Sequence, residues 1–260
     1  MFEKISTLNK KIKNEKPLVL NITNYVTMDF VANGLLSLGA SPVMSKAKQE
    51  TADLLKITSA VVINLGTLNS EFIELCSHVC ALANTLGTPV ILDPVGAGAS
   101  AYRTQTCEKL LADHQIAIVR GNASEIMALA GSNLLTKGVD SSTSSDRAVS
   151  SAQALAKQLN TTVVISGETD FVIDAENIAQ FSRGVAMMPM ITGTGCLLSA
   201  IVGAFHAVDS NAFSAASAGT LFYSICGEIA AERAEGPGTF KMHFLDALYS
   251  QPLRDHYENN

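Results

Sequence analysis

The sequence predicts an α/β fold with a mostly parallel central sheet and helices on both faces. Short continuous apolar runs occur at residues 18–22, 60–64, 89–92, 116–119 and 162–166. Such runs are typical of strands that are covered on both faces. Stretches with helical periodicity separate them, and strands that alternate with helices of this length build right-handed βαβ units with parallel strands.

The expected helices follow the strands in order along the chain. They lie at residues 28–38, 71–86, 105–112, 124–130 and 146–159. After the strand at 162–166 we expect a hairpin to residues 171–173, and from Cys196 onward helices at 196–207, 212–234 and 245–248. The polar segment 140–146 is a flexible insert that also suits a helix cap. No linker or internal repeat interrupts this order, so we expect a single domain over residues 1–260.

The composition indicates a large aliphatic core and argues against a nucleic-acid partner. Hydrophobic residues make up 47% of the chain, charged residues 16%, and tryptophan is absent. The net charge is −6, and the basic residues form no cluster beyond a scatter of lysines near the N-terminus. A nucleic-acid-binding face needs a concentrated positive charge, which this sequence does not provide.

Residues 184–208 contain no charged side chain and are long enough to span a bilayer. Pro189 and the Gly193 and Gly195 turn interrupt this stretch, and His206 lies inside it. We therefore expect a strand, a turn and a buried helix here, and no membrane partner. The polar N-terminus also lacks the apolar segment of a signal peptide.

The five cysteines are odd in number and form no C-x-x-C motif. Cys76 and Cys80 are four residues apart on an expected helix and share one face. Without a second pair at metal-ligand spacing, they are predicted to be core residues rather than zinc ligands. This pattern favours a reduced, cytoplasmic setting.

The most informative segment is 191–200, where a Gly193-Thr194-Gly195 turn runs into an apolar helix. The glycines allow a tight turn that brings N–H groups close to a ligand, and the helix start adds unpaired donors and a positive dipole end. Together they predict an anion hole for a transferring phosphoryl group. Cys196 lies in the first turn, so we expect its pKa to fall below the free value of about 8.5. The alternative is a structural glycine turn with a small buried cysteine.

Polar residues also follow the predicted strands, at the sheet edge where open parallel sheets bind ligands. Asp93 precedes the glycine-rich segment 94–98 and suits either Mg²⁺ or a side-chain cap of its own loop. Arg120 ends a strand and suits a nucleotide phosphate. Ser166 ends another strand, with a simple turn role as its alternative.

Glu125 follows Asn122 by three residues, a spacing that resembles a helix capping box. Motifs for other chemistries are absent from the sequence. There is no GxxxxGK[ST] phosphate loop, no GxGxxG after the first strand, and neither GxSxG nor HExxH.

At the level of whole motifs, the chain resembles hydroxyethylthiazole kinase, a family of the ribokinase-like superfamily. The resemblance runs through nearly the whole chain with its motifs in order. Those motifs are TNYVTM at 23–28, ANGLLSLGASPVM at 32–44, DPVGAG at 93–98, RGNASE at 120–125 and GTGC at 193–196.

The resemblance implies a three-layer ribokinase-like fold and ATP- and Mg²⁺-dependent phosphorylation of 4-methyl-5-(2-hydroxyethyl)thiazole, in thiamine salvage. It also implies a homotrimer with thiazole sites at the subunit interfaces. Position by position, it places Met44 against the thiazole and Gly193 at the substrate hydroxyl. Further matching positions are Arg120 and Ser166 for ATP, and Asp93 and Glu125 for Mg²⁺.

Two positions depart from the wider patterns. Leu20 and Asn21 stand where the family usually shows His-Cys, which alters the polarity of the entry strand. Cys196 stands where other ribokinase relatives carry an aspartate base, as expected of a thiazole kinase. The hypothesis is that Cys196, if partly ionised, accepts the hydroxyethyl proton, while the N–H groups of 193–196 stabilise the phosphoryl charge.

Two other classes of function remain open at this point. One is an ADP-dependent dehydratase of the same fold acting on hydrated nicotinamide nucleotides, which would need Asp at position 196. The other is a sensor that binds thiazole or nucleotide without turnover.

Overall fold

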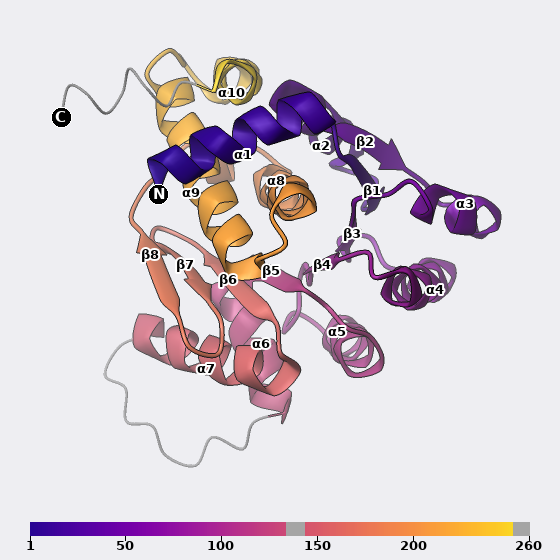
Figure 1. The fold of residues 1–260 in the computed structure, drawn as a ribbon. Coiled ribbons are helices and arrows are strands. Elements are labelled where there is room, and N and C mark those ends of the chain that lie inside the picture. Colours follow the sequence, from indigo (N-terminus) through magenta and orange to yellow (C-terminus); the bar gives the residue numbers. More distant parts are fainter. Residues whose placement is uncertain (134–143, 252–260) are drawn as a thin grey trace.

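A computed structural model of the 260-residue chain describes residues 1–133 and 144–251. One eight-stranded sheet runs through it in the order β2-β1-β3-β4-β5-β6-β7-β8 (Figure 1). Strands β1 to β6 pair in parallel and β7 and β8 are antiparallel, which confirms the mostly parallel sheet. The strands are β1 (Leu18–Ile22), β2 (Ser41–Met44), β3 (Ala60–Asn64), β4 (Val90–Asp93), β5 (Ile118–Asn122), β6 (Thr162–Ser166), β7 (Asp170–Ile173) and β8 (Ile178–Phe181).

Helices cover both faces of the sheet, as predicted for a three-layer fold (Figure 1). On one face lie α1 (Phe2–Glu15), α2 (Met28–Leu38), α8 (Thr194–Val208), α9 (Ala212–Ala231) and α10 (Pro237–Ser250). On the other face lie α3 (Thr51–Leu55), α4 (Ser70–Leu86), α5 (Ala101–Asp113), α6 (Ala123–Asn133) and α7 (Ser144–Leu159). Short 3-10 helices occur at η1 (Lys48–Glu50) and η2 (Met188–Met190).

The sheet divides the apolar interior into two cores because successive side chains of a strand point to opposite faces. In β1, Val19 packs in the core beneath α8 and α9, whereas the next residue, Leu20, packs in the core beneath α4 and α5. Cys76 and Cys80 are buried on the inner face of α4, and their free thiols confirm the prediction that they are core residues.

Several elements differ from the sequence-based expectation. Helix α1 was not expected, although Ile5, Leu8 and Ile12 form a buried stripe at helical spacing. The short strand β2 was not expected either, because Pro42 disfavours a central strand; β2 lies at the sheet edge, where proline is tolerated. Strand β8 and helix α3 were also missed.

The strand expected within residues 184–208 is wrong. Residues 184–193 form turns and η2 before α8 begins, since Pro189 cannot donate to a strand ladder. Helix α10 begins at Pro237, well before the expected position 245. The expected insert at 140–146 lies largely outside the described residues, and α7 already begins at Ser144. No helix within the described ranges is long and apolar enough to cross a membrane.

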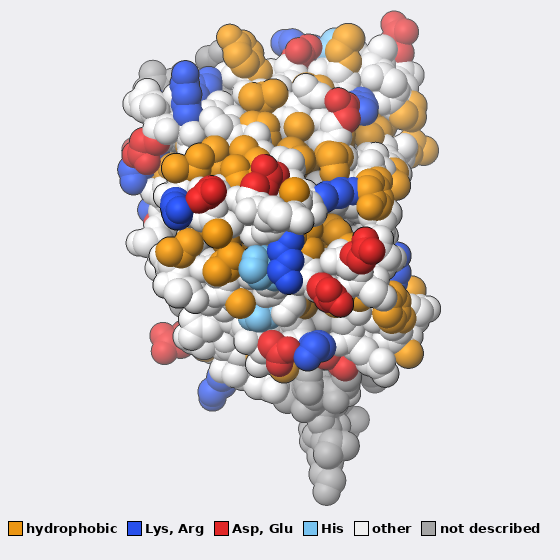
Figure 2. All heavy atoms as spheres, turned by 90° about the vertical axis from the view of Figure 1, so that its right-hand side faces the viewer, with side chains coloured by type: hydrophobic (Ala, Val, Ile, Leu, Met, Phe, Trp, Pro, Cys, Tyr) orange, Lys and Arg blue, Asp and Glu red, His pale blue; other side chains and the backbone are white. Residues whose placement is uncertain are grey.

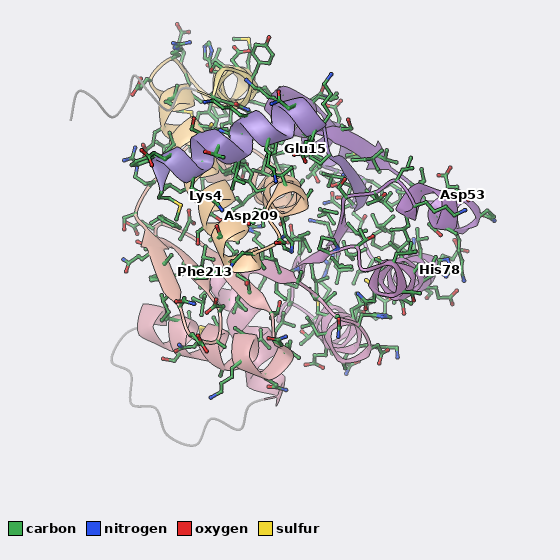
Figure 3. All side chains as sticks on the ribbon, in the orientation of Figure 1. Lys4, Glu15, Asp53, His78, Asp209 and Phe213 are labelled. Atoms are coloured by element: carbon green, nitrogen blue, oxygen red, sulfur yellow. The ribbon has the colours of Figure 1, made fainter. Side chains whose placement is uncertain are left out.

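A contact between distant segments joins α1 to the end of α8. Lys4 of α1 forms an ion pair of 2.9 Å with Asp209, which follows α8, and Figure 3 shows the two side chains beside each other. On the opposite side of the molecule, His78 of α4 hydrogen-bonds Thr51 of α3 at 3.1 Å. Figure 2 shows the face around α3 and α4, where charged side chains of both signs are mixed with apolar ones.

Candidate active site

The carboxyl ends of neighbouring strands bring a row of polar side chains together beneath the start of α8. Asn64 ends β3 and Asp93 ends β4, and the two are direct partners in the parallel register. Arg120 lies near the end of β5 and Ser166 ends β6. Sheet topology alone therefore assembles residues that are up to 102 positions apart, counted from Asn64 to Ser166.

The Gly193-Thr194-Gly195 turn forms the predicted tight start of α8. Gly193 is the N-cap residue and has a φ of 98°, a left-handed conformation that favours glycine. A Cβ on Gly195 would lie 2.8 Å from Arg120 Nη1. Glycine at this position therefore allows the guanidinium to lie directly against the positive end of the helix.

A cavity of about 740 Å³ opens beside this turn. Four of the predicted site residues line it together, namely Arg120, Ser166, Thr194 and Gly195. We call it the Arg120 cavity. Tyr223 also lines it and donates a 2.6 Å hydrogen bond to the carbonyl of Thr194, which anchors the turn to α9.

Arg120 supplies a buried positive charge to this cavity, with 8% of its surface exposed. Its Nη2 donates to Ser166 Oγ, and its Nη1 lies 3.7 Å from Asp93 Oδ2. The buried Nε has no hydrogen-bond partner among the described residues. An unpartnered guanidinium donor next to a cavity is suited to an anion such as a phosphate.

Asp93 is almost completely buried, with 1% of its surface exposed. Its Oδ2 accepts hydrogen bonds of 2.8 Å from both Asn64 Nδ2 and Ser199 Oγ. These partners lie on β3 and α8, so the alternative that the side chain caps its own loop is wrong. Burial raises the pKa of Asp93, although the nearby Arg120 charge opposes that shift.

Cys196 lies next to this buried carboxylate, in the first turn of α8. Asn24 Nδ2 lies 3.4 Å from Cys196 Sγ and 2.8 Å from Asn64 Oδ1, which links the thiol to Asp93 through two amides. The expected decrease of the Cys196 pKa is wrong. Burial and the neighbouring Asp93 charge raise this pKa, although hydrogen bonds with the side chains of Thr27, Asn64 and Asn24 oppose the shift.

We call Asn24, Asn64, Asp93, Cys196 and Ser199 the Asp93 cluster. The sequence analysis singled out Asp93 and Cys196 but not the other three. The signal was present at Asn64, a polar residue that ends an apolar run in the same way as Asp93. Ser199 offered no signal, because a serine within an apolar helix is commonly a simple buried small residue.

Glu125 forms the predicted capping box at the start of α6. Asn122 N donates to Glu125 Oε2 at 2.9 Å, and Glu125 N donates to Asn122 Oδ1 at 2.9 Å. The other carboxylate oxygen, Oε1, accepts a 2.8 Å hydrogen bond from Gly96 N. Glu125 therefore ties the glycine-rich segment after β4 to the helix after β5.

The described residues contain no group of three or more side chains arranged to hold a metal ion. Mg²⁺, however, commonly uses only one or two protein carboxylates together with waters and substrate phosphates. Asp93 Oδ1 is buried and has no hydrogen-bond partner among the described residues, so it fits such a role. The oxygens of Glu125 each retain one free lone pair and fit a contact through water.

Met44 is the predicted site residue that lies apart from the others. It ends the edge strand β2 and is half-buried against the core that contains α8 and α2. It is not part of the wall of the Arg120 cavity. Its register partner Asn21 is buried in β1 and donates to Val19 O at 2.9 Å.

Comparison with known proteins first defines the class. The structure superposes on a ribokinase-like superfamily protein from Enterococcus faecalis V583 with a TM-score of 0.67 at 13% identity, covering 90% of this chain and 87% of that chain. That likeness shows a ribokinase-like fold. The fold is therefore ribokinase-like, and a glycine turn and a buried arginine lie at its sheet edge, where open parallel sheets bind ligands.

The sequence then identifies the family. The Hydroxyethylthiazole kinase family model matches residues 9–253. A hydroxyethylthiazole kinase from Vibrio parahaemolyticus is 47% identical over 249 residues, which are 96% of this chain and 94% of the relative. The structure of a hydroxyethylthiazole kinase protein from Pyrococcus horikoshii OT3 gives a TM-score of 0.88 at 36% identity, covering 95% and 92% of the two chains. The chain belongs to the hydroxyethylthiazole kinase family, and it is an enzyme.

Proposed function

We propose that this enzyme transfers the γ-phosphoryl group of ATP to the hydroxyl of 4-methyl-5-(2-hydroxyethyl)thiazole, for thiamine salvage. The hydroxyl oxygen forms a bond to the γ-phosphorus, the bond to the β-phosphate oxygen breaks, and ADP leaves. The observation that carries the proposal is the Gly193-Thr194-Gly195 turn, which starts a helix beside the cavity that holds Arg120. Phosphoryl transfer depends on positioning and charge stabilisation, and this arrangement supplies both.

The nucleotide is proposed to bind in the Arg120 cavity. The buried Nε of Arg120 supports this role, since it lacks a partner among the described residues and is available to donate to a phosphate oxygen. Ser166, held by the same guanidinium, is proposed to contact ATP as well. The N–H groups of the Gly193-Thr194-Gly195 turn are proposed to stabilise the charge on the transferring phosphoryl group.

Cys196 is proposed to accept the proton of the substrate hydroxyl, with Gly193 beside that hydroxyl. Its raised pKa means that the thiolate fraction is small at neutral pH. The contribution of proton transfer is therefore modest at pH 7 and grows as the pH rises. Asn24, at 3.4 Å from the sulfur, orients the thiol within the Asp93 cluster.

A divalent metal is proposed to be Mg²⁺, held by Asp93 and, through water, by Glu125. When bound, the ion would neutralise charge on the phosphate oxygens of the nucleotide. The support from this structure is the unpartnered Oδ1 of Asp93. Glu125 keeps its capping role at the same time, since each oxygen has a second lone pair.

The thiazole site is proposed to lie near Met44, at interfaces of a homotrimer. Met44 lies on the edge strand β2, and Tyr25 and Val26 nearby in the sequence motif are 59% and 69% exposed. Apolar side chains exposed to this degree are suited to burial against a second subunit. Sedimentation equilibrium is expected to give three times the 27.4 kDa mass of one chain.

Residues 1–260 are proposed to form one kinase domain, because all eight described strands join one sheet. The cytoplasm is the proposed location, and the five free cysteines support a reducing compartment.

The decisive experiment incubates the purified protein with ATP, Mg²⁺ and the thiazole alcohol and measures ADP. We expect ADP formation that depends on the alcohol, with the thiazole phosphate as second product. ADP formation without the alcohol, or with a hydrated nicotinamide nucleotide in its place, would contradict the proposal. Ligand binding with no turnover would identify a sensor instead.

A further inference from the structure

The two oxygens of the Asp93 carboxylate have very different surroundings. Two neutral donors, Asn64 Nδ2 and Ser199 Oγ, both hydrogen-bond Oδ2 at 2.8 Å. Arg120 Nη1 also lies nearest to Oδ2, at 3.7 Å. Oδ1 is equally buried, yet none of the described residues donates to it. Burying a carboxylate oxygen without a hydrogen-bond partner is energetically unfavourable unless a ligand binds to that oxygen.

The orientation of Asn64 is determined by its other contacts. Its Oδ1 accepts one hydrogen bond from Gly66 N at 3.0 Å and another from Asn24 Nδ2 at 2.8 Å. Two donors therefore fix the carbonyl end of this amide. The NH₂ group must then point to Asp93, so Asn64 acts as a donor toward Oδ2.

Ser199 reaches the same oxygen from α8 rather than from the sheet. It lies one helical turn after Gly195 on α8, and it is completely buried. Its hydroxyl donates to Asp93 Oδ2 at 2.8 Å and is 3.4 Å from the carbonyl of Gly195. This hydrogen bond joins the helix that begins at the glycine turn to the end of β4.

We propose that Asn64 and Ser199 are positioning residues that hold Asp93 Oδ2 and thereby present Oδ1 to the divalent cation. This inference rests on the proposed function, in which Asp93 holds that cation. Neither residue touches the substrate or the metal. They act by holding the carboxylate in one orientation. Without them it could rotate and pair both of its oxygens with Arg120.

Ser199→Ala tests the proposal with the least disturbance, because alanine favours the helix and removes only the hydroxyl. The probe is Mn²⁺, titrated into protein saturated with a non-hydrolysable ATP analogue and followed by electron paramagnetic resonance. Loss of an outer-shell partner typically weakens metal affinity or activity by about 10–100-fold. We expect a loss of that size in Mn²⁺ affinity and in kcat at fixed Mg²⁺, with an unchanged KM for the thiazole alcohol.

Two further variants complete the design. Ser199→Thr keeps the donor and is expected to retain most of the wild-type Mn²⁺ affinity. Ser217→Ala is the matched control, since Ser217 is also completely buried in a helix but its hydroxyl has no partner among the described residues. The control is expected to leave Mn²⁺ affinity and kcat unchanged. If Ser199→Ala does not fold, Asn64→Ala removes the other donor and is expected to give the same loss.

Wild-type Mn²⁺ affinity and kcat in a folded Ser199→Ala protein would overturn the proposal. Unchanged Mn²⁺ affinity in Asp93→Asn would also overturn it, because Oδ1 would then not be a ligand, even if the protein is an active kinase. If the wild-type protein forms no ADP with the thiazole alcohol while Ser199→Ala still weakens Mn²⁺ binding, the proposed reaction fails and the positioning role stands.

Discussion

The Asp93 cluster and the Arg120 cavity lie side by side, yet they are built on opposite principles. In the Asp93 cluster the side chains hydrogen-bond one another, only Asp93 Oδ1 lacks a partner among the described residues, and Asp93 is 1% exposed. The Arg120 cavity is open, about 740 Å³ in volume, and its guanidinium Nε is unpartnered among the described residues. A closed hydrogen-bond network holds its side chains in fixed positions, whereas an open cavity can bind a ligand. We therefore expect the cluster to control kcat and the cavity to control the KM for ATP.

The largest effect is expected from Asp93→Asn. This change removes the buried carboxylate that is proposed to hold the cation, which is worth several kcal/mol of charge stabilisation. We expect kcat to fall by about 10³-fold with little change in the KM for ATP. Steady-state kinetics at saturating Mg²⁺ measure this. A higher KM for ATP with an unchanged kcat would contradict the division between cluster and cavity.

Arg120→Met is expected to have the next largest effect, and this effect is on the KM for ATP. Methionine keeps the length of the side chain but removes the charge and the donors that face the cavity. Charged hydrogen bonds contribute about 1.5–3 kcal/mol, so we expect the KM for ATP to rise by about 10–100-fold. The exposed Arg233→Met on the same chain is the control and is expected to behave as wild type.

Gly195→Ala probes the close approach of the α8 start to Arg120 within the Arg120 cavity. Its added methyl group would lie 2.8 Å from Arg120 Nη1, so the guanidinium must move. We expect about a tenfold decrease in kcat/KM for ATP, because small displacements of a positioning group reduce transfer. Gly238→Ala, where an added Cβ would meet none of the described residues within 4 Å, is the matched control. Equal activity of the two variants would show that the close approach is unimportant.

Substitution of Cys196 is expected to have a smaller effect on kcat and to change how the rate depends on pH. Since burial and Asp93 raise its pKa, the thiol is mostly protonated at pH 7, and the rate is expected to increase as the pH approaches that pKa. Cys196→Ala is expected to lower kcat at pH 7 by about tenfold or less, below the ~10²–10⁴-fold typical of general-base catalysis, because little thiolate is present at that pH. Cys196→Asp is expected to keep or gain activity with a flatter pH profile between 7 and 9. A wild-type rate independent of pH would contradict the base role.

The smallest effect concerns stability. Burial raises the pKa of Asp93 in the folded state above its unfolded value, so the folded protein binds more protons in the interval between the two. The contribution of Asp93 to stability is therefore lost as the pH rises through that interval. We expect Asp93→Asn to increase the Tm at pH 7 while leaving it unchanged well below pH 4. Asp113→Asn is the control; Asp113 is exposed at the end of α5 and pairs with Lys109 at 2.9 Å, and it is expected to change the Tm little because exposed ion pairs contribute little to stability. A lower Tm in Asp93→Asn would mean that pairing with Arg120 outweighs burial.

The parts of the site that could be predicted from the sequence are those defined by a local pattern. Arg120 and Ser166 each end an apolar run, and the rule that parallel strands end at one edge is enough to bring them together. The Gly193-Thr194-Gly195 turn was recognisable because its glycines precede an apolar helix. Glu125 was recognisable as a capping residue because the capping box needs only a spacing of three.

The remaining parts depend on contacts between distant positions. Ser199 reaches Asp93 across 106 positions of sequence, and Asn24 reaches Cys196 across 172. The direction of the Cys196 pKa shift also depends on such distant contacts. A helix start is visible in the sequence, but burial next to a carboxylate is not.

The sequence by itself determined the alternation of strands and helices, the family and the residues at the strand ends. These follow from local periodicity and from short motifs, which need no knowledge of distant contacts. Only the tertiary structure decided which oxygen of Asp93 is paired, that the surroundings of Cys196 raise its pKa, and that Met44 lies away from the Arg120 cavity. The physical reason is that burial and hydrogen-bond partners are properties of neighbours in space, and those neighbours come from the whole length of the chain.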